Sequence, residues 1–409
     1  MPVPKRVLIV AYHFPPEPVS GALRMGYLAK YLPELGWEPH VLTRRTSFAA
    51  GQHPNVIRVG GSYRVAKAAE PAPRRSTGSE RMREIARAIA FFPDRASWWI
   101  PAAISAGIAA HRRVRFDAVL SSAMPASAHV VGAAVSAACN VPWVADYRDL
   151  WHGNPHVFES PVRAVLLRKL ELQTLRRAAE ITTITESMAR SLRELHRRNV
   201  TTIPNTMDAA EWENVPFAEP DCFRLLHVGS LYDGRRNPEL LFSAISALRA
   251  QGEPAGTDAR MDFFGPACGS LAEAARRFGI EGEVSYGGIV ERSQAMRLER
   301  SAALLLVIQP NDPATSGEFG SKIFEYEGAG RPILAIGPPG SVLRAYIAER
   351  KLGWFASSHD EVRDALRAAY GAYAAGRLQR SQAAENPAVR MTEAFASVLT
   401  RNVSRRCAS

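Results

Sequence analysis

The sequence has little cysteine and no long apolar run, and both absences exclude classes of protein. Its 409 residues include four cysteines, with no CxxC pair and no spacing to histidine that would suggest a zinc site. These are Cys139, Cys222, Cys268 and Cys407. A disulfide framework is not suggested either, so a reducing cytoplasm is the simplest setting. No apolar stretch approaches the ~20 residues that span a bilayer, and the opening MPVPKRVLIVAYHF lacks the cleavage site of a signal peptide.

Acidic residues are fewer than basic ones. Lys and Arg number 51 against 40 Asp and Glu, which gives a formal charge of +11. Such a surplus favours contact with phosphates, an anionic membrane surface or nucleic acid, although solvated arginines alone would give the same number. The basic residues are not interleaved with aromatic platforms, so we expect no nucleic-acid partner. The length predicts two domains.

Strand-like and helix-like segments alternate over the first 215 residues. RVLIVAY is a β-branched apolar run, GALRMGYLAKYLPELGW has apolar residues at a spacing near 3.6, and EPHVLTRR is again strand-like. The same order returns in FDAVLSSA, ASAHVVGAAVSAACN and VPWVADYRD, and then in AEITTITESMARSLREL and VTTIPNTMD. Strands that alternate with helices build a parallel sheet. We therefore predict a doubly wound, Rossmann-like α/β domain at 1–215.

A polar linker, NVPFAEPDCF, follows, and the alternation then starts again. The strand-like segments RLLHVGSLY, ARMDFFGP, EVSYGGIV, ALLLVIQP and RPILAIGP are separated by helical ones. This predicts a second Rossmann-like domain at 216–387, with a C-terminal helix near 388–409 that packs back on the first domain. The default ligand site is a cleft that the two domains face across.

Residues 73–101 depart from this alternation, because they are basic and then aromatic. Two interpretations stay open. The segment contacts a membrane, with Trp98 and Trp99 as interfacial anchors, or it is a helix packed on the domain with solvated arginines. SPVRAVLLRKLELQTLRRAAE is similar, but leucines at helical spacing are more often core than membrane face.

In the first half, candidate ligand residues lie where predicted strands end. Ser20 and Gly21 open the helix after the first strand, where free N–H groups attract anions and glycine lets a ligand approach. No GxGxxG is present, so NAD and FAD are not expected. His13 and Arg24 are close by in sequence, and a structural role suits His13 better.

A charged cluster also follows the strand VPWVADY. Asp146, Arg148 and Asp149 lie at its carboxyl end, which is where open α/β sheets bind ligands. A bracing ion-pair network would use the same residue types, and both interpretations stay open.

In the second half, HVGSLYDGRRNPELL repeats this strand, turn and helix order. Gly229 and Ser230 end a strand, and Arg235 and Arg236 precede a helix. Two guanidiniums beside a helix N-terminus suit a pyrophosphate, since each can bind phosphate oxygens bidentately. Solvated loop arginines are the alternative, and the strand, turn and helix context favours phosphate.

The segment SGEFGSKIFEYEGAGRPILAI places Lys322 at a helix start and Glu325 one turn later on the same face. The lysine can bring a positive charge to a phosphate, and the carboxylate can accept both hydroxyls of a ribose. An ordinary surface ion pair has the same spacing, so these residues alone do not decide.

Three segments in order resemble glycosyltransferase family 4. VLIVAYHFPPEPVSGALRMGYLAKYLPELGWEPHVLT resembles its opening βαβ unit, and TTIPNTMD resembles the turn before its interdomain linker. GSKIFEYEGAGRPILA resembles its donor signature, with Glu325, Gly330 and Pro332 in register. The resemblance covers nearly the whole chain and implies the GT-B fold. GSKIFEY with ADYRDLW looks like a branch found in bacterial surface-polysaccharide and glycoconjugate clusters.

The resemblance implies a retaining, hexosyltransferase-type enzyme that moves a sugar from a nucleotide sugar to a glycan, glycolipid or small-molecule glycoside. It implies no cofactor and no metal, and a cytoplasmic protein, free or peripheral at the inner face of the membrane. The donor-binding residues implied are Ser20, Gly21, Gly229, Ser230, Arg235, Arg236, Phe319, Gly320, Ser321, Lys322 and Glu325. Catalysis would use Arg236, Lys322 and Glu318. Arg24, Arg148 and Asp149 would face the acceptor.

The sequence departs from the family pattern in two places. The first Glu of the family's Glu-x7-Glu pair falls on Gly317, so Glu318 is shifted by one. The arginine of the phosphate clamp falls on Ser230 and its lysine on Arg236, and Lys322 is expected to supply the missing charge. A GT-B sugar-nucleotide epimerase and a catalytically silent, nucleotide-binding GT-B protein are the alternatives.

Overall fold

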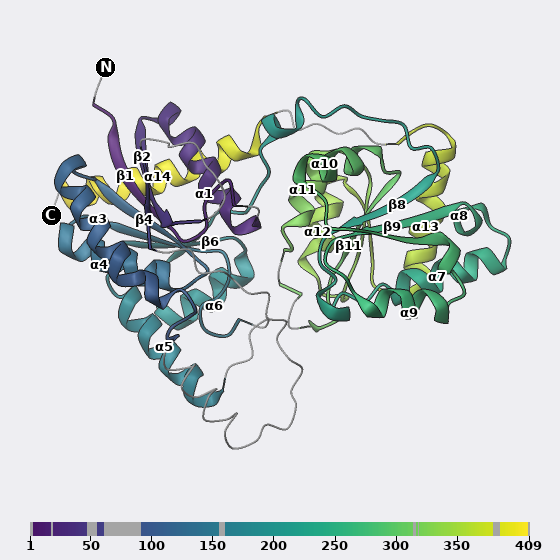
Figure 1. Cartoon of the computed structure of the whole chain (residues 1–409), viewed down its shortest axis with the longest axis horizontal. Coiled ribbons are helices and arrows are strands. Elements are labelled where there is room, and N and C mark those ends of the chain that lie inside the picture. Colours follow the sequence, from purple (N-terminus) through teal and green to yellow (C-terminus); the bar gives the residue numbers. More distant parts are fainter. Residues whose placement is uncertain are drawn as a thin grey trace. The chain divides into compact units, whose positions relative to one another are not determined.

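The computed structural model describes residues 3–17, 19–46, 55–60, 91–154, 160–313, 316–317, 319–378 and 385–407. The chain divides into two compact units (Figure 1). The N-terminal unit is Met1–Pro204 with Ala388–Ser409, and the C-terminal unit is Asn205–Pro387. Residues 205–215, which the sequence pattern assigns to the first domain, lie in the second unit, where Trp212 is buried in an apolar cluster of that unit.

The N-terminal unit has one parallel sheet of seven strands in the order β3-β2-β1-β4-β5-β6-β7. The strands are β1 (Lys5–Ala11), β2 (Trp37–Arg44), β3 (Val56–Val59), β4 (Ala118–Ala123), β5 (Trp143–Tyr147), β6 (Glu180–Thr183) and β7 (Val200–Thr202). The order turns back between β1 and β4, as in a doubly wound fold. The predicted doubly wound sheet is therefore confirmed, and β3 is an edge strand that the sequence pattern missed.

Helices cover both faces of this sheet. One face carries α3 (Ile100–Val114), α4 (Ser127–Cys139), α5 (Pro161–Leu175) and α6 (Glu186–His196). The other carries α1 (Ser20–Tyr31) and the C-terminal helix α14 (Pro387–Cys407). Phe395 and Leu399 of α14 are fully buried in the same cluster as Met25 and Leu28 of α1. Figure 1 shows α14, in yellow, beside the purple α1 although almost the whole chain separates them in sequence.

The C-terminal unit has a parallel sheet of six strands in the order β10-β9-β8-β11-β12-β13. The strands are β8 (Phe223–Val228), β9 (Ala259–Phe264), β10 (Val284–Gly288), β11 (Leu304–Ile308), β12 (Ile333–Ile336) and β13 (Gly353–Ala356). One face is covered by α7 (Glu239–Ala250), α9 (Gly269–Arg277) and α13 (His359–Ala374), with the short α8 (Pro254–Thr257) next to α7. The other is covered by α10 (Arg292–Ser301), α11 (Lys322–Ala329) and α12 (Val342–Arg350).

Local sequence sets several helix ends. Thr185 accepts a hydrogen bond from Met188 N at the start of α6, and Ser358 does the same for Glu361 N at the start of α13. Gly330 ends α11 at a φ of 72°, which glycine adopts without strain. The glycine that fits the family signature in sequence is thus the C-cap that separates α11 from β12.

The tryptophans proposed as membrane anchors lie in or against the core of the N-terminal unit. Trp99 is fully buried, and Trp98 packs against the same apolar cluster. Residues 61–90 lie outside the described part of the chain. For Trp98 and Trp99 the packed interpretation is therefore right, because the Trp99 ring packs edge-on against Tyr12 and both rings lie against Gly60. Among the described residues, no helix is long and apolar enough to cross a membrane.

Candidate functional site

The carboxyl ends of β8 and β11 gather the C-terminal unit's candidate residues. The two strands are neighbours at the centre of the sheet, and the chain leaves them towards helices on opposite faces, α7 after β8 and α11 after β11. Such a switch point leaves a crevice where doubly wound folds bind ligands. Gly229 and Ser230 follow β8 directly, and Lys322 opens α11.

Lys322 links the start of α11 to the end of β8. Its Nζ donates to Glu325 Oε2 at 2.6 Å and to Glu299 Oε1 at 3.4 Å. Its Cε lies 3.8 Å from the position that a Cβ would take on Gly229. The lysine therefore reaches from the start of α11 to the end of β8. An ammonium group has three N–H donors, so one remains beyond its two carboxylate partners.

The two carboxylates beside Lys322 differ in their surroundings. Glu325 is partly exposed, and its Oε1 also accepts a 3.4 Å hydrogen bond from Arg292 Nη1. Glu299, on α10, is fully buried, and its Oε2 has no hydrogen-bond partner among the described residues. Burial, and then the nearby negative charge of Glu325, raise the pKa of Glu299 to about 8. Burial therefore favours the protonated form of Glu299.

Arg236 approaches the same point from the β8 side. Its Nη1 donates to Ser230 O at 3.4 Å, and its guanidinium lies over the Tyr232 ring, 4.7 Å from the centroid. Its Nη2 lies 3.7 Å from the position of a Cβ on Gly320. The structure thus brings Arg236 to the loop before α11, whereas Arg235 is exposed.

The remaining predicted residues of this unit shape a turn, pack on neighbouring rings or lie outside the described residues. Ser230 Oγ accepts from Tyr232 N at 3.0 Å and so shapes the turn after β8. Phe319 packs on Phe324 and Tyr346, with ring centroids 5.9 and 5.1 Å away. Ser321 is exposed and its side chain makes no cap bond to α11, while Ile323 N donates to Gly320 O at 3.3 Å. The positive end of the helix dipole still favours an anion at this point. Glu318 lies outside the described residues.

His227 is a residue of this site that the sequence pattern did not single out. It is buried on β8, and its Nδ1 lies 3.0 Å from Leu306 O, which can only accept, so Nδ1 carries the proton. Its bare Nε2 lies 3.5 Å from the Cβ position of Gly229 and has no partner among the described residues. Burial first, and then the charges of Arg236 and Lys322, lower the pKa of His227 to about 4. A histidine inside the apolar run RLLHV was the available signal.

In the N-terminal unit, Arg148 lies against the start of α1. Its Nε donates to Ser122 Oγ at 3.0 Å and its Nη2 to Met124 O at 2.7 Å, while a Cβ on Gly21 would overlap its Nη1. The helix begins at Ser20 without a side-chain cap bond. Gly21 is therefore needed for the close approach of a guanidinium. The side chain of Ser20 lies outside the described part of the chain.

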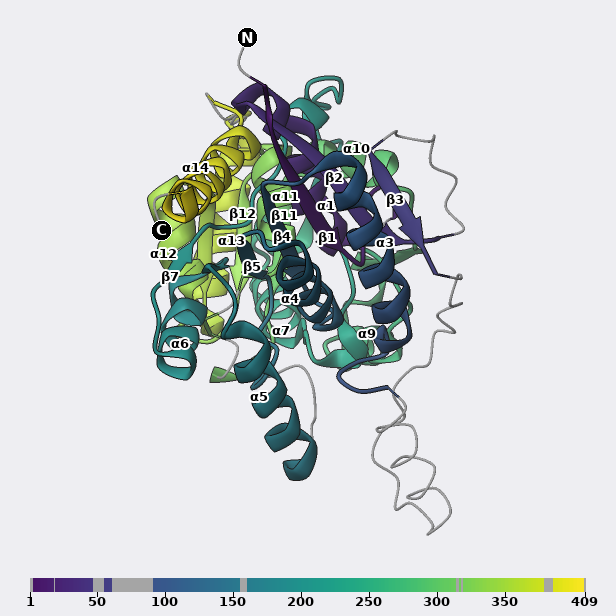
Figure 2. The ribbon, with the colours of Figure 1, turned by 90° about the vertical axis from the view of Figure 1, so that its left-hand side faces the viewer.

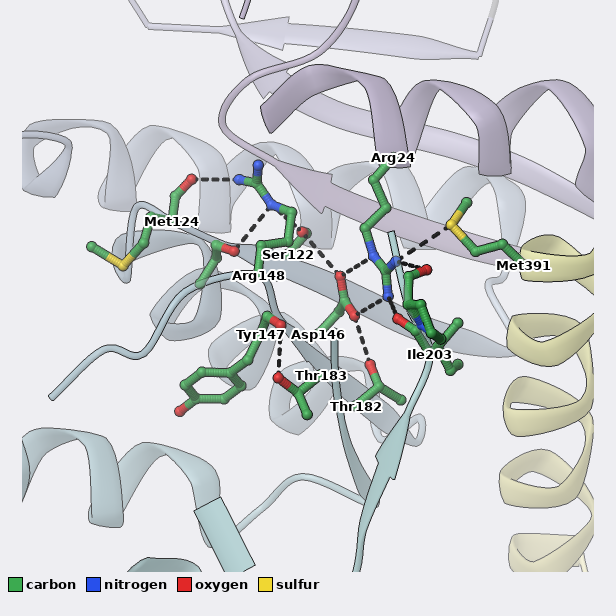
Figure 3. A network of polar contacts seen from close by, with 12 residues as sticks. Arg24, Ser122, Met124, Asp146, Tyr147, Arg148, Thr182, Thr183, Ile203 and Met391 are labelled. Carbon is green, nitrogen blue, oxygen red and sulfur yellow. Dashed lines mark hydrogen bonds and ion pairs between the residues drawn. The ribbon is translucent and has the colours of Figure 1, made fainter. Parts of the chain in front are cut away.

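Arg24 and Asp146 form a buried ion pair (Figure 3). Arg24 Nε and Nη2 each lie 3.0 Å from a carboxylate oxygen of Asp146. Arg24 also donates to the carbonyls of Ile203 and Pro204. Asp146 is therefore the bracing partner of Arg24, not of Arg148, and Arg24 is 3% exposed. Asp149, next to Arg148, is exposed.

His13 has the structural surroundings expected for it. Its Nδ1 lies 3.0 Å from Glu17 Oε2, and Arg44 holds the other oxygen of the same carboxylate. Hydrogen bonds from both partners lower the pKa of Glu17 against the opposing effect of burial. As for metals, no three or more His, Cys, Asp or Glu side chains are grouped as ligands within the described ranges.

Comparisons with known proteins agree with this architecture. A family model described as Glycosyltransferase Family 4 matches residues 22–211, and no curated protein matches the chain. The fold is similar to sucrose-phosphate synthase from Thermosynechococcus elongatus, with a TM-score of 0.62 and 15% identity over 99% of this chain and 100% of that one. It is also similar to HepE from Anabaena in complex with UDP, with a TM-score of 0.56 and 14% identity over 98% of each chain.

A third similar structure is MnaA of S. aureus with UDP, at a TM-score of 0.51 and 13% identity over 98% of this chain and 97% of that one. At such identities the likeness concerns the fold. It agrees with the presence of two parallel sheets. The chain therefore has the GT-B fold, and a little under half of it, residues 22–211, matches the model of Glycosyltransferase Family 4.

Proposed function

We propose that this glycosyltransferase moves a hexosyl group from a nucleoside diphosphate sugar to an acceptor hydroxyl, with retention of the anomeric configuration. The acceptor is a glycan, a glycolipid or a small-molecule glycoside, in the synthesis of a bacterial surface polysaccharide or glycoconjugate. One observation carries the proposal: Lys322, Arg236 and Glu325 converge where β8 and β11 end. The complexes of HepE with UDP and with UDP-glucose support a nucleotide-sugar donor.

In this proposal the diphosphate lies at the N-terminus of α11. Lys322 gives its third N–H to a phosphate oxygen while it keeps both carboxylate partners, and Arg236 contributes a second cation. Glu325, partly exposed beside Lys322, accepts the ribose hydroxyls. The uncapped N–H groups of α11 complete the anion site.

The chemistry follows from where charge develops. The bond between the anomeric carbon and the β-phosphate oxygen breaks, and its electron pair moves to the diphosphate. The acceptor oxygen attacks the anomeric carbon from the same face, and its proton passes to an oxygen of the departing diphosphate. Lys322, Arg236 and the α11 N–H groups are fixed in place before the reaction and stabilise the departing diphosphate. No step of this account uses a metal.

The N-terminal unit supplies the acceptor residues of the proposal. Arg148 and Asp149 lie at the carboxyl end of β5, and Arg148 donates hydrogen bonds to Ala123 O at the end of β4 and to Met124 O directly after it. Ser20 and Gly21, which are assigned with the donor residues and not with the acceptor, offer the N-terminus of α1 to an anion. Arg24 acts on the acceptor only through Asp146 and β5, since its guanidinium is buried.

The donor assignment is tested by thermal shift and by calorimetric titration with UDP, GDP, ADP and dTDP, because a ligand of the folded state raises its melting temperature. We expect one base to dominate. Lys322→Ala should weaken binding of that diphosphate by about 10- to 100-fold, the effect of losing a hydrogen bond to a charged group. It should weaken the matching monophosphate less. Glu325→Ala should weaken both alike, because the ribose is common to them.

Arg276→Ala is the matched control, since Arg276 is an exposed cation on α9 of the same unit. Unchanged nucleotide binding in both site variants would return Lys322 and Glu325 to an ordinary ion pair. Nucleotide binding without transfer to any acceptor would favour a silent nucleotide-binding protein. Epimerisation of the free nucleotide sugar would favour the epimerase alternative.

A further inference from the structure

Helix α5 has apolar residues on two opposite faces. Leu167 and Leu175 are buried in the core of the N-terminal unit. On the other face Val162, Val165 and Leu166 are 72%, 54% and 50% exposed. Their spacing of three and four residues places them side by side on one helix surface, which we name the apolar patch. Scattered exposed apolar residues are ordinary on a protein surface, but a contiguous group marks a contact surface.

The charges around the apolar patch have one sign. Arg168, Lys169, Arg176 and Arg177 are exposed on α5 or directly after it. The only acidic residue of the helix, Glu171, is fully buried, where its carboxylate accepts a 2.8 Å hydrogen bond from Tyr147 Oη. The solvent face of α5 is therefore apolar at its N-terminal end and cationic further along, and within Pro161–Leu175 it exposes no carboxylate.

The apolar patch lies at an end of the helix that projects. Figures 1 and 2 show the N-terminal end of α5 extending away from the body of the N-terminal unit, while its C-terminal end lies against the neighbouring helices. The burial agrees, since Leu175 is fully buried and Val162 is the most exposed of the patch. A projecting helix end can meet a flat surface without a clash from the rest of its unit.

We propose that α5 docks the protein on an anionic lipid bilayer. Val162, Val165 and Leu166 enter the boundary between headgroups and acyl chains, and the four cations contact lipid phosphates. An interfacial helix binds through buried apolar area together with attraction to anionic lipid, and the exposed face of α5 presents both. This goes beyond the proposed transfer reaction, because it requires neither the donor site nor an acceptor.

Vesicle co-sedimentation tests the proposal. The full-length protein should sediment with vesicles of phosphatidylcholine and phosphatidylglycerol, and far less with phosphatidylcholine alone. Because each cation near an anionic surface contributes about fivefold to binding, Arg168→Gln with Lys169→Gln should lower the partition more than tenfold, roughly, at low salt. The triple variant Val162→Ser, Val165→Ser, Leu166→Ser should lower it about tenfold or more by removing the apolar contribution.

Matched control variants distinguish vesicle binding by this surface from non-specific binding. Val3→Ser with Ile289→Ser changes two other strongly exposed apolar residues, and Arg276→Gln with Lys351→Gln changes two exposed cations of the other unit. Both should sediment like the wild type. All variants should keep the wild-type melting temperature and nucleotide-induced shift, because every changed side chain is exposed.

Three results would overturn the proposal. The first is a wild type that ignores anionic vesicles. The second is a triple variant that sediments like the wild type, or controls that lose binding as much as it does. The third is a triple variant that converts a dimer into a monomer in light scattering, because the apolar patch would then be an interface between two copies of the chain.

Discussion

Glu299 is a fully buried carboxyl group that forms an ion pair with Lys322. Its pKa is raised to about 8 by burial and by Glu325, against an ordinary value of 4.5. Between these two values the folded chain holds a proton that the unfolded chain releases. Raising the pH through this window therefore favours unfolding, by at most about 1.4 kcal/mol per pH unit. The stabilisation is complete below the ordinary value and is lost as the pH passes 8.

Glu299→Gln should remove this dependence, since an amide keeps the shape and does not titrate. In melting experiments from pH 5 to pH 9, the variant should gain stability relative to the wild type as the pH rises. Glu273→Gln, at an exposed position on α9, should track the wild type throughout. If the stability of wild type and Glu299→Gln changed with pH in parallel, the pKa of Glu299 would not be raised by folding.

Gly21 is a position at which one added atom, a Cβ, is expected to disturb the neighbouring Arg148 guanidinium. A Cβ there would overlap Arg148 Nη1, so Gly21→Ala should push the guanidinium away from Ser122 and Met124. We expect at least about a tenfold loss of kcat/KM, the effect of losing one charged hydrogen bond. Gly371→Ala, with open space around its Cβ position, should keep full activity. An active Gly21→Ala enzyme would remove Arg148 from the acceptor side.

Contacts between individual residues could be predicted from the sequence where the two partners are close along the chain. Lys322 and Glu325 are three residues apart, and their contact follows from helix geometry. Arg24 and Asp146 are 122 residues apart, so no local pattern could pair them. Glu299 stands in RSQAMRLERSA, which resembles any solvated helix, and only the packing of α10 on β8 and near α11 buries it.

Strands, too, could be predicted only where the local sequence carries a clear apolar pattern. Central strands were recognised because they are continuous apolar runs, such as LLLVI in β11. The edge strands β3 and β13 have four residues each and are only partly buried, so they carry little apolar signal. Trp98 and Trp99 were ambiguous because burial of an aromatic pair depends on neighbours from distant segments, here Gly60 and Tyr12.

The brace of α1 on β5 gives a prediction for whole elements. Arg24 joins α1 to Asp146 on β5, to the carbonyls after β7, and to Met391 on α14, 3.3 Å away. Losing one partner of a buried ion pair is destabilising by about 3–5 kcal/mol, so Arg24→Ala should lower the unfolding free energy of the N-terminal unit by that amount in urea. Arg193→Ala, which removes an exposed pair with Glu186, should change it little. Similar midpoints for both variants would contradict the brace.

For the whole molecule, the two units have separate cores and sheets, so we expect two calorimetric transitions. Phe395→Ala empties a fully buried position in the N-terminal unit and should destabilise only one transition, by about 3–5 kcal/mol. Leu366→Ala, at a fully buried position of α13, should lower only the other transition.

If the donor site is where β8 and β11 end, UDP, or whichever diphosphate binds, should raise the transition that Leu366→Ala lowers. At roughly 100-fold above Kd the gain is about 2.7 kcal/mol, or roughly 5–10 °C for a unit of this size. A nucleotide that instead raised the transition lowered by Phe395→Ala would place the donor on the N-terminal unit, and Lys322, Arg236 and Glu325 would lose their assignment.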